Sequence, residues 1–174
     1  MALALLLGTA AAAAGFLVTS WFGVVLAQHG PHGTMIRFLV TRHVLYAIPT
    51  LLLSLFSQSM VLFYFIGTGR LVKDEIGSLP EESRRVVLRA LRRFKARTSP
   101  PATFAMLAAI AAFVLGGWVH TAPLSVRPAA HVAHLASAVV ALLLHLWALL
   151  AEYPVFVENN VLMGDPAAYG RRSP

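Results

Sequence analysis

Four long stretches of the chain are made almost entirely of apolar residues, and polar segments separate them. They cover residues 2–27, 43–67, 102–119 and 129–157. Each has the roughly 18–25 residues that an α-helix needs to cross about 30 Å of hydrocarbon at about 1.5 Å per residue. The pattern therefore predicts an all-α, multi-pass membrane protein that forms a single bundle of four transmembrane helices.

The first stretch, 2–27, must be distinguished from a secretory signal peptide. No basic residue precedes its apolar run, and the run is much longer than the roughly 7–15 residues of a signal. We therefore expect residues 2–27 to be retained as the first transmembrane helix.

The composition supports a bilayer protein and excludes several kinds of site. Charged residues make up only 12% of the chain, whereas a soluble domain has about 25%. The chain has no cysteine, which excludes disulfides, thiolate-bound metals and Fe–S clusters. No motif assigns a reaction, and the glycines of "FIGTGR", Gly67 and Gly69, indicate the end of the second helix rather than a phosphate-binding loop.

The basic residues predict the orientation. Nine of the 14 Lys and Arg residues lie in the segment 70–100, between the second and third apolar stretches. Because excess positive charge stays on the cytoplasmic side of a membrane, we expect this segment to be cytoplasmic. Four crossings then place both termini, including the tail 158–174, in the cytoplasm, with residues 28–42 and 120–128 on the outer side.

The basic segment itself contains a helix signal. Ser78 followed by Glu81 is typical of a helix start, and Pro100 and Pro101 are expected in the first turn of the third transmembrane helix. Apolar residues recur at helical spacing among the arginines. This predicts a cytoplasmic amphipathic helix whose residues 84–97 rest on anionic headgroups. An acidic partner is the alternative, whereas nucleic acid is not expected because no groove-fitting or aromatic pattern accompanies the charge.

Polar residues form a narrow stripe on two of the four predicted helices. At about 100° per residue, one face of the fourth helix carries His134, His145, Glu152 and Asn159. Because ionisable groups are unfavourable in lipid, we expect the two stripes to face each other or a bound group. The first and third helices, rich in Ala and Gly, would be the packing walls. The stripe of the second helix consists of His43, Tyr46, Thr50, Ser54, Ser57, Tyr64 and Thr68, with Gln58 at its edge.

The two striped helices run in the same direction, so the depths of their residues can be compared. His43 matches His134, Ser54 matches His145, Tyr64 lies near Glu152, and Thr68 lies near Asn159. Six of the seven histidines fall at the outer level, and His145 alone is deep. The outer six are His29, His32, His43, His120, His131 and His134.

Histidines at equal depth on two helices of a bundle are typical axial ligands of haem b. We expect His43 to pair with His134, or with His131 one turn away. His131 and His145 are 14 residues apart, a spacing that resembles the paired ligands on one helix in membrane cytochromes b. Since the second helix offers only serines at the depth of His145, we expect one haem near the outer face.

Two further interpretations remain open. Outer histidines without a carboxylate, His29, His32 and His120, could bind Cu or Zn. The polar axis could instead carry protons or ions, or accommodate quinone on the inner half. Its residues are His145, Glu152, Tyr64, Ser54, Gln58 and Asn159.

The leading hypothesis is a redox-associated membrane subunit that binds one haem b. A proton or ion pathway, a histidine-based metal-site protein and a non-catalytic structural subunit are the alternatives. The small size predicts association with other membrane subunits or with further copies of the chain.

Overall fold

The computed structural model describes residues 2–28 and 34–172, and every element in these ranges is helical. His29 and His32, two of the predicted metal ligands, lie outside the described residues. The elements are α1 (Ala2–Gln28), α2 (Thr34–Glu75), the 3₁₀-helix η1 (Ile76–Ser78), α3 (Glu81–Thr121), α4 (Arg127–Gly164) and α5 (Pro166–Arg172).

The described part of the chain contains four helices, α1 to α4, that are long and apolar enough to cross a membrane. The predicted all-α architecture with four long apolar helices is thereby confirmed. Each predicted stretch lies within one of these helices, but α2, α3 and α4 are much longer than the stretches themselves.

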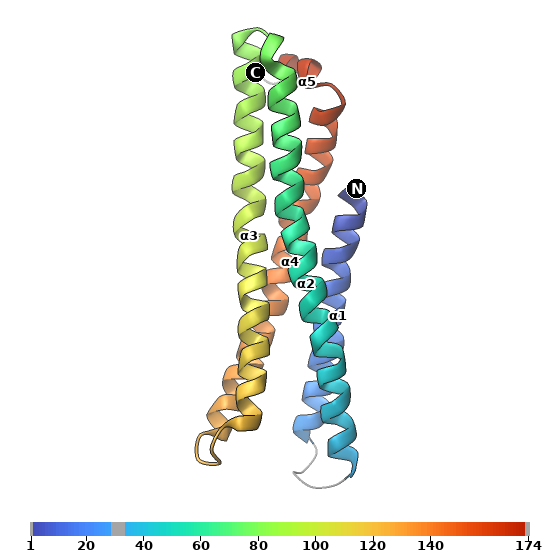
Figure 1. The fold of residues 1–174 in the computed structure, drawn as a ribbon, viewed down its shortest axis with the longest axis vertical. Coiled ribbons are helices and arrows are strands. Elements are labelled where there is room, and N and C mark those ends of the chain that lie inside the picture. The colour runs from blue at the N-terminus through green and yellow to red at the C-terminus, as the bar shows by residue number, and fades with distance from the viewer. Residues whose placement is uncertain (1, 29–33, 173–174) are drawn as a thin grey trace.

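The four long helices form an elongated bundle in which neighbours along the chain are antiparallel (Figure 1). α1 packs against α2 and α4, and α3 packs against the same two helices. α2 and α4 are therefore diagonal to each other across the bundle axis. This arrangement explains how polar stripes on these two helices can both point inward.

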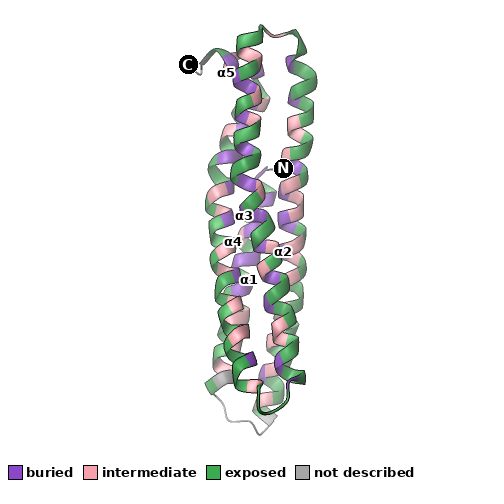
Figure 2. Ribbon diagram, turned by 90° about the vertical axis from the view of Figure 1, so that its left-hand side faces the viewer, coloured by how far each residue is buried: buried purple, intermediate pink, exposed green. Residues whose placement is uncertain are grey.

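The two ends of the bundle differ. At one end, here called the pocket end, α1 ends and α2 begins, and the chain passes from α3 to α4. At the other end α2, α3 and α4 extend well beyond the beginning of α1 and are joined by α5 (Figure 1). This extension, residues 68–98 and 156–172, is here called the stalk. Buried residues follow the facing sides of the helices and become fewer towards the pocket end (Figure 2).

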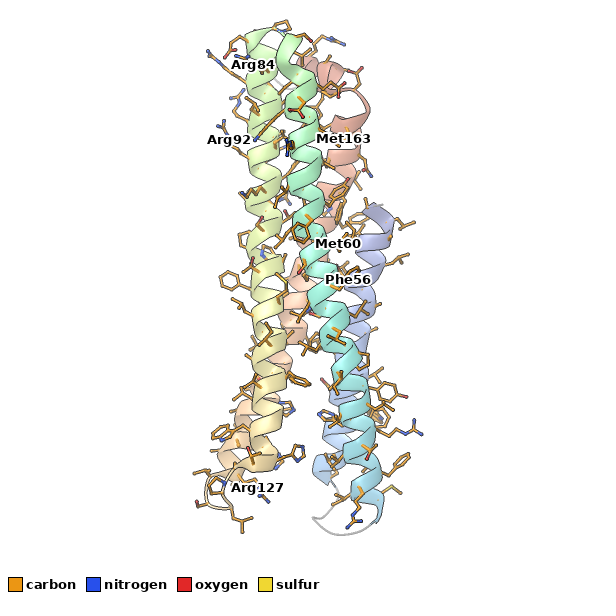
Figure 3. The ribbon with its side chains drawn as sticks, in the orientation of Figure 1. Phe56, Met60, Arg84, Arg92, Arg127 and Met163 are labelled. Atoms are coloured by element: carbon orange, nitrogen blue, oxygen red, sulfur yellow. The ribbon has the colours of Figure 1, made fainter. Side chains whose placement is uncertain are left out.

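The stalk corrects the prediction of a separate amphipathic helix. Residues 84–97 form part of α3, and their apolar side is buried against α2 and α4 in a core that includes Val72, Phe94 and Leu162. This side is therefore not free to insert among headgroups. The basic side chains point away from the core, as Arg84 and Arg92 do in Figure 3.

Three predicted helix boundaries are also wrong. α2 continues through Gly67 and Gly69 to Glu75, and α3 continues through Pro100 and Pro101 from its start at Glu81. Packing explains both cases, because buried apolar residues of the stalk and of the bundle flank these positions and offset their weak helix propensity. Ser78 ends η1, and Pro80 occupies the N-cap position of α3 without a side-chain capping bond.

α5 is fixed to the stalk by polar contacts and by one close approach. The Tyr169 hydroxyl donates to Glu158 Oε1 at 2.6 Å, and Arg93 forms a salt bridge with the same carboxylate. Burial and the neighbouring Glu158 raise the pKa of Tyr169 to about 12. A Cβ atom at Gly170 would lie 2.9 Å from the Cβ of Ser83, so only glycine allows α5 to pack this closely on α3.

Candidate functional site

Two histidines from the diagonal helices meet near the pocket end. His43 of α2 and His134 of α4 have ring centroids 5.9 Å apart, and the ring planes are nearly perpendicular, at 86°. The predicted match in depth between these residues is confirmed.

Each of the two imidazoles is oriented by a backbone carbonyl of a neighbouring helix. His43 Nδ1 lies 2.9 Å from the carbonyl oxygen of Thr19 on α1, and His134 Nδ1 lies 3.0 Å from that of Ala112 on α3. A carbonyl oxygen only accepts hydrogen bonds, so Nδ1 carries the proton in both rings. Nε2 is then the unprotonated nitrogen, and it has no hydrogen-bond partner among the described residues.

A glycine next to each carbonyl makes these contacts possible. Gly23 lies four residues after Thr19, and Gly116 lies four residues after Ala112. In a helix, a side chain covers the turn that precedes its own Cα, so a glycine exposes the carbonyl one turn back. A Cβ atom would lie 3.3 Å from His43 Cε1 at Gly23, and 2.9 Å from His134 Cε1 at Gly116. The same arrangement therefore occurs twice, once in each helical hairpin.

The two rings line a cavity of about 400 Å³ between the helices. It lies towards the pocket end, where the α1–α2 pair and the α3–α4 pair are set apart (Figure 1). All four helices contribute to its wall, which is mostly apolar and includes Phe16, Leu51 and Phe113. Such an enclosure suits a largely apolar ligand that has a few polar attachment points.

The remaining histidines of this end are less enclosed. His131 lines the cavity but is exposed, and His120 is exposed near the end of α3. Both lie close enough to His134 to interact with it electrostatically. Among residues 2–28 and 34–172, no group of three or more His, Asp or Glu side chains could hold a metal ion. Of the predicted metal ligands, only His120 lies in the described part of the chain.

His145 lies deeper, below the floor of the cavity. Its Nδ1 donates to the carbonyl oxygen of Ala141 at 2.8 Å, and its Nε2 accepts a hydrogen bond from Ser54 Oγ at 2.6 Å. The ring of Phe16, which lines the cavity, lies 4.6 Å from the imidazole, measured between centroids. The predicted pairing of Ser54 with His145 is confirmed, and both nitrogens of this histidine are occupied.

Glu152 lies one level further towards the stalk and is fully buried. Its Oε2 is 3.3 Å from Thr9 Oγ1 of α1, and Gln58 Nε2 of α2 donates to the same Thr9 oxygen at 3.3 Å. Thr9 was not among the predicted site residues, because α1 was expected to provide only a packing wall. The sequence marks this position only by a hydroxyl side chain directly before the alanine run "AAAAAG".

The last polar group lies at the base of the stalk. Asn159 Nδ2 donates to the Tyr64 hydroxyl at 3.0 Å and approaches Thr68 Oγ1 at 3.4 Å, while Tyr64 donates to Asn160 Oδ1 at 3.1 Å. The predicted proximity of Thr68 and Asn159 is confirmed. The Tyr64 hydroxyl, expected near Glu152, bonds instead to the two asparagines, one of which is exposed.

No protein-family model matches this sequence, and no curated protein or solved structure matches the chain. The geometry of the described residues is therefore the guide to function.

Proposed function

We propose that the protein is an integral membrane redox subunit that binds one haem b between His43 and His134. The observation that carries this proposal is the pair of imidazoles in the wall of an apolar cavity, each with Nδ1 bonded to a carbonyl and Nε2 free. Both imidazoles thus have the tautomer of a metal ligand that bonds through Nε2.

The spacing and the enclosure fit this group. A bond between an imidazole nitrogen and a metal is about 2 Å long, so two such bonds in line place the ring centroids about 6 Å apart. The observed separation is 5.9 Å. The cavity volume of about 400 Å³ lies within the range of about 300–1,000 Å³ that is typical of ligand and cofactor pockets.

A haem held by His43 and His134 would supply one-electron transfer. The residues of this chain would hold and orient the group: the carbonyls of Thr19 and Ala112 fix the rings, and Gly23 and Gly116 leave room for them. Fixed rings favour electron transfer, because little rearrangement accompanies the change of charge. Other membrane subunits or further copies of the chain would supply and accept the electron.

The distribution of basic residues predicts the orientation of the chain in the membrane. The basic stalk belongs in the cytoplasm by the positive-inside rule, which places the haem near the outer face and both termini inside. Exposed arginines such as Arg85, Arg89 and Arg92 would contact anionic headgroups or an acidic partner through charge alone. The polar groups around His145, Glu152 and Tyr64 would handle protons, with quinone as an alternative ligand of the inner half.

Absorption spectroscopy of the purified protein tests the haem proposal. We expect a Soret band in the wild type that is lost or strongly reduced in His43→Ala and in His134→Ala. His120→Ala is the matched control, because His120 lies at the same end but is exposed, and it should keep the band. A colourless wild type after expression with added haem, or an equal loss in all three variants, would contradict the proposal.

A further inference from the structure

Glu152 is fully buried in the bundle, and no basic side chain of the described residues contacts it. α1 presents Thr9, and α2 presents Gln58 with Tyr64 further along. α3 presents no ionisable group, because Lys95 and Arg97 are exposed. On α4 itself, the nearest ionisable group on the same face is His145, about two turns away, whereas Glu158 lies about 120° around the helix and pairs with Arg93 and Tyr169. An ionised carboxylate is strongly unfavourable in such surroundings.

One arrangement of the hydrogen bonds around Thr9 satisfies all three of its polar contacts at once. Thr9 Oγ1 lies 3.2 Å from the carbonyl oxygen of Leu5, 3.3 Å from Glu152 Oε2 and 3.3 Å from Gln58 Nε2. A hydroxyl has one proton to donate and two lone pairs to accept with. If Thr9 donates to Leu5, which can only accept, its two lone pairs accept from Gln58 and Glu152. All three contacts are then satisfied, provided that Glu152 carries a proton on Oε2.

We propose that Thr9, Gln58 and Glu152 form a proton-binding site in which Glu152 is a neutral carboxylic acid that exchanges its proton towards the stalk. This site specifies the proton-handling part of the proposed function, and it does not depend on the presence of a haem.

The direction of exchange follows from the neighbours of the site along the axis. Towards the stalk, Asn159 and Tyr64 continue the polar line to the exposed Asn160. Glu152 Oε1, Gln58 Oε1 and Asn159 Oδ1 are buried acceptors without a hydrogen-bond partner among the described residues. Towards the pocket end, the next polar group on α4 is His145, whose two nitrogens are both engaged.

Infrared spectroscopy of the purified full-length protein tests whether the acid is neutral. At neutral pH we expect the carbonyl stretch of a protonated carboxylic acid, which shifts to lower frequency in D₂O and is absent in Glu152→Gln. Glu158→Gln is the matched control: Glu158 is paired with Arg93 and Tyr169 in the stalk, and this variant should keep the band. Absence of the band from the wild type, or its persistence in Glu152→Gln, would overturn the proposal.

The rate of hydrogen–deuterium exchange at this band tests the direction. Tyr64→Phe keeps the ring but removes the hydroxyl, and it should slow the exchange several-fold. Tyr153→Phe is the matched control, because Tyr153 lies next to Glu152 in the sequence but is exposed, and it should leave the rate unchanged. Equal rates in all three proteins would refute exchange through Tyr64. The visible spectrum of the same samples reports haem separately, so failure of either proposal can be distinguished from failure of the other.

Discussion

Replacing Gly116 with alanine should displace the imidazole of His134, because the added methyl group enters the space that the ring occupies. The Cβ atom would lie 2.9 Å from Cε1 and 3.3 Å from Nδ1 of His134. The ring must then rotate or move away, and its hydrogen bond to the carbonyl of Ala112 is lost. Gly117→Ala is the matched control, since a Cβ atom at Gly117 has no neighbour within 4 Å.

The expected loss of stability is the difference in the free energy of unfolding between Gly116→Ala and Gly117→Ala. Glycine to alanine in a helix interior stabilises by roughly 0.5–1 kcal/mol, and this gain applies to both positions. Overpacking at Gly116 costs about 1–3 kcal/mol, and a hydrogen bond contributes about 0.5–1.5 kcal/mol. Because ring rotation relieves the clash while breaking the bond, these two losses are alternatives. The molecule takes the cheaper of the two, so Gly116→Ala should be about 0.5–1.5 kcal/mol less stable than Gly117→Ala.

Unfolding by SDS in mixed micelles, followed by circular dichroism, measures this difference in stability. The haem content of the same preparations provides a second readout, which should fall in Gly116→Ala and remain at the wild-type level in Gly117→Ala. Equal stability and equal haem content in the two variants would refute the proposed role of Gly116 in positioning His134.

Three further predictions concern other parts of the molecule. Ser54→Ala leaves His145 Nε2 buried without its donor and should destabilise the protein by about 1–2 kcal/mol in SDS unfolding. Ser59→Ala, which loses only a bond at 3.5 Å to the weak acceptor Met106 Sδ, should have a smaller effect. Phe94→Ala removes a side chain from the stalk core and should cost about 3–5 kcal/mol in the same assay; a negligible loss would contradict the packed stalk. Tyr169 should ionise near pH 12, detected as the phenolate absorbance that is missing in Tyr169→Phe, and its contribution to stability should be lost as the pH rises from about 10 to about 12.

The membrane-spanning helices could be predicted because their signal is local. A run of apolar residues between polar segments identifies a span, and the periodic positions of His134, His145 and Glu152 identify the face that avoids lipid. Residues on one face of two helices that run in the same direction meet at equal depth. For this reason the contacts of His43 with His134 and of Ser54 with His145 follow from counting along the chain.

The stalk could not be predicted in the same way. Its core joins Val72, Phe94 and Leu162, which lie far apart in the sequence, and no single segment shows that these residues meet. Gly67 and Pro100 weaken a helix locally, so a reading of local signals ends the helices there. The packing of three helices outweighs these local preferences.

The contacts that orient the histidines and Glu152 could not be predicted from the sequence either. Nothing in the sequence separates a glycine that only allows close packing, such as Gly15 in "AAAAG", from Gly23 in "SWFGVV" or Gly116 in "AAIAAFVLGG", which expose a carbonyl to a histidine. The role of Thr9 could not be predicted for the same reason, because its partners Gln58 and Glu152 lie on other helices. Such roles depend on the rotation of one helix against its neighbour, which residue counting leaves undetermined.

The central claim is that His43 and His134 together bind a single haem. Its most direct test is the haem content and the spin state of the oxidised protein, measured on one purified sample by pyridine haemochrome assay and electron paramagnetic resonance. We predict one haem per chain with the low-spin signal of two axial imidazoles. A five-coordinate high-spin signal, or a sample without stoichiometric haem after reconstitution, would contradict the claim.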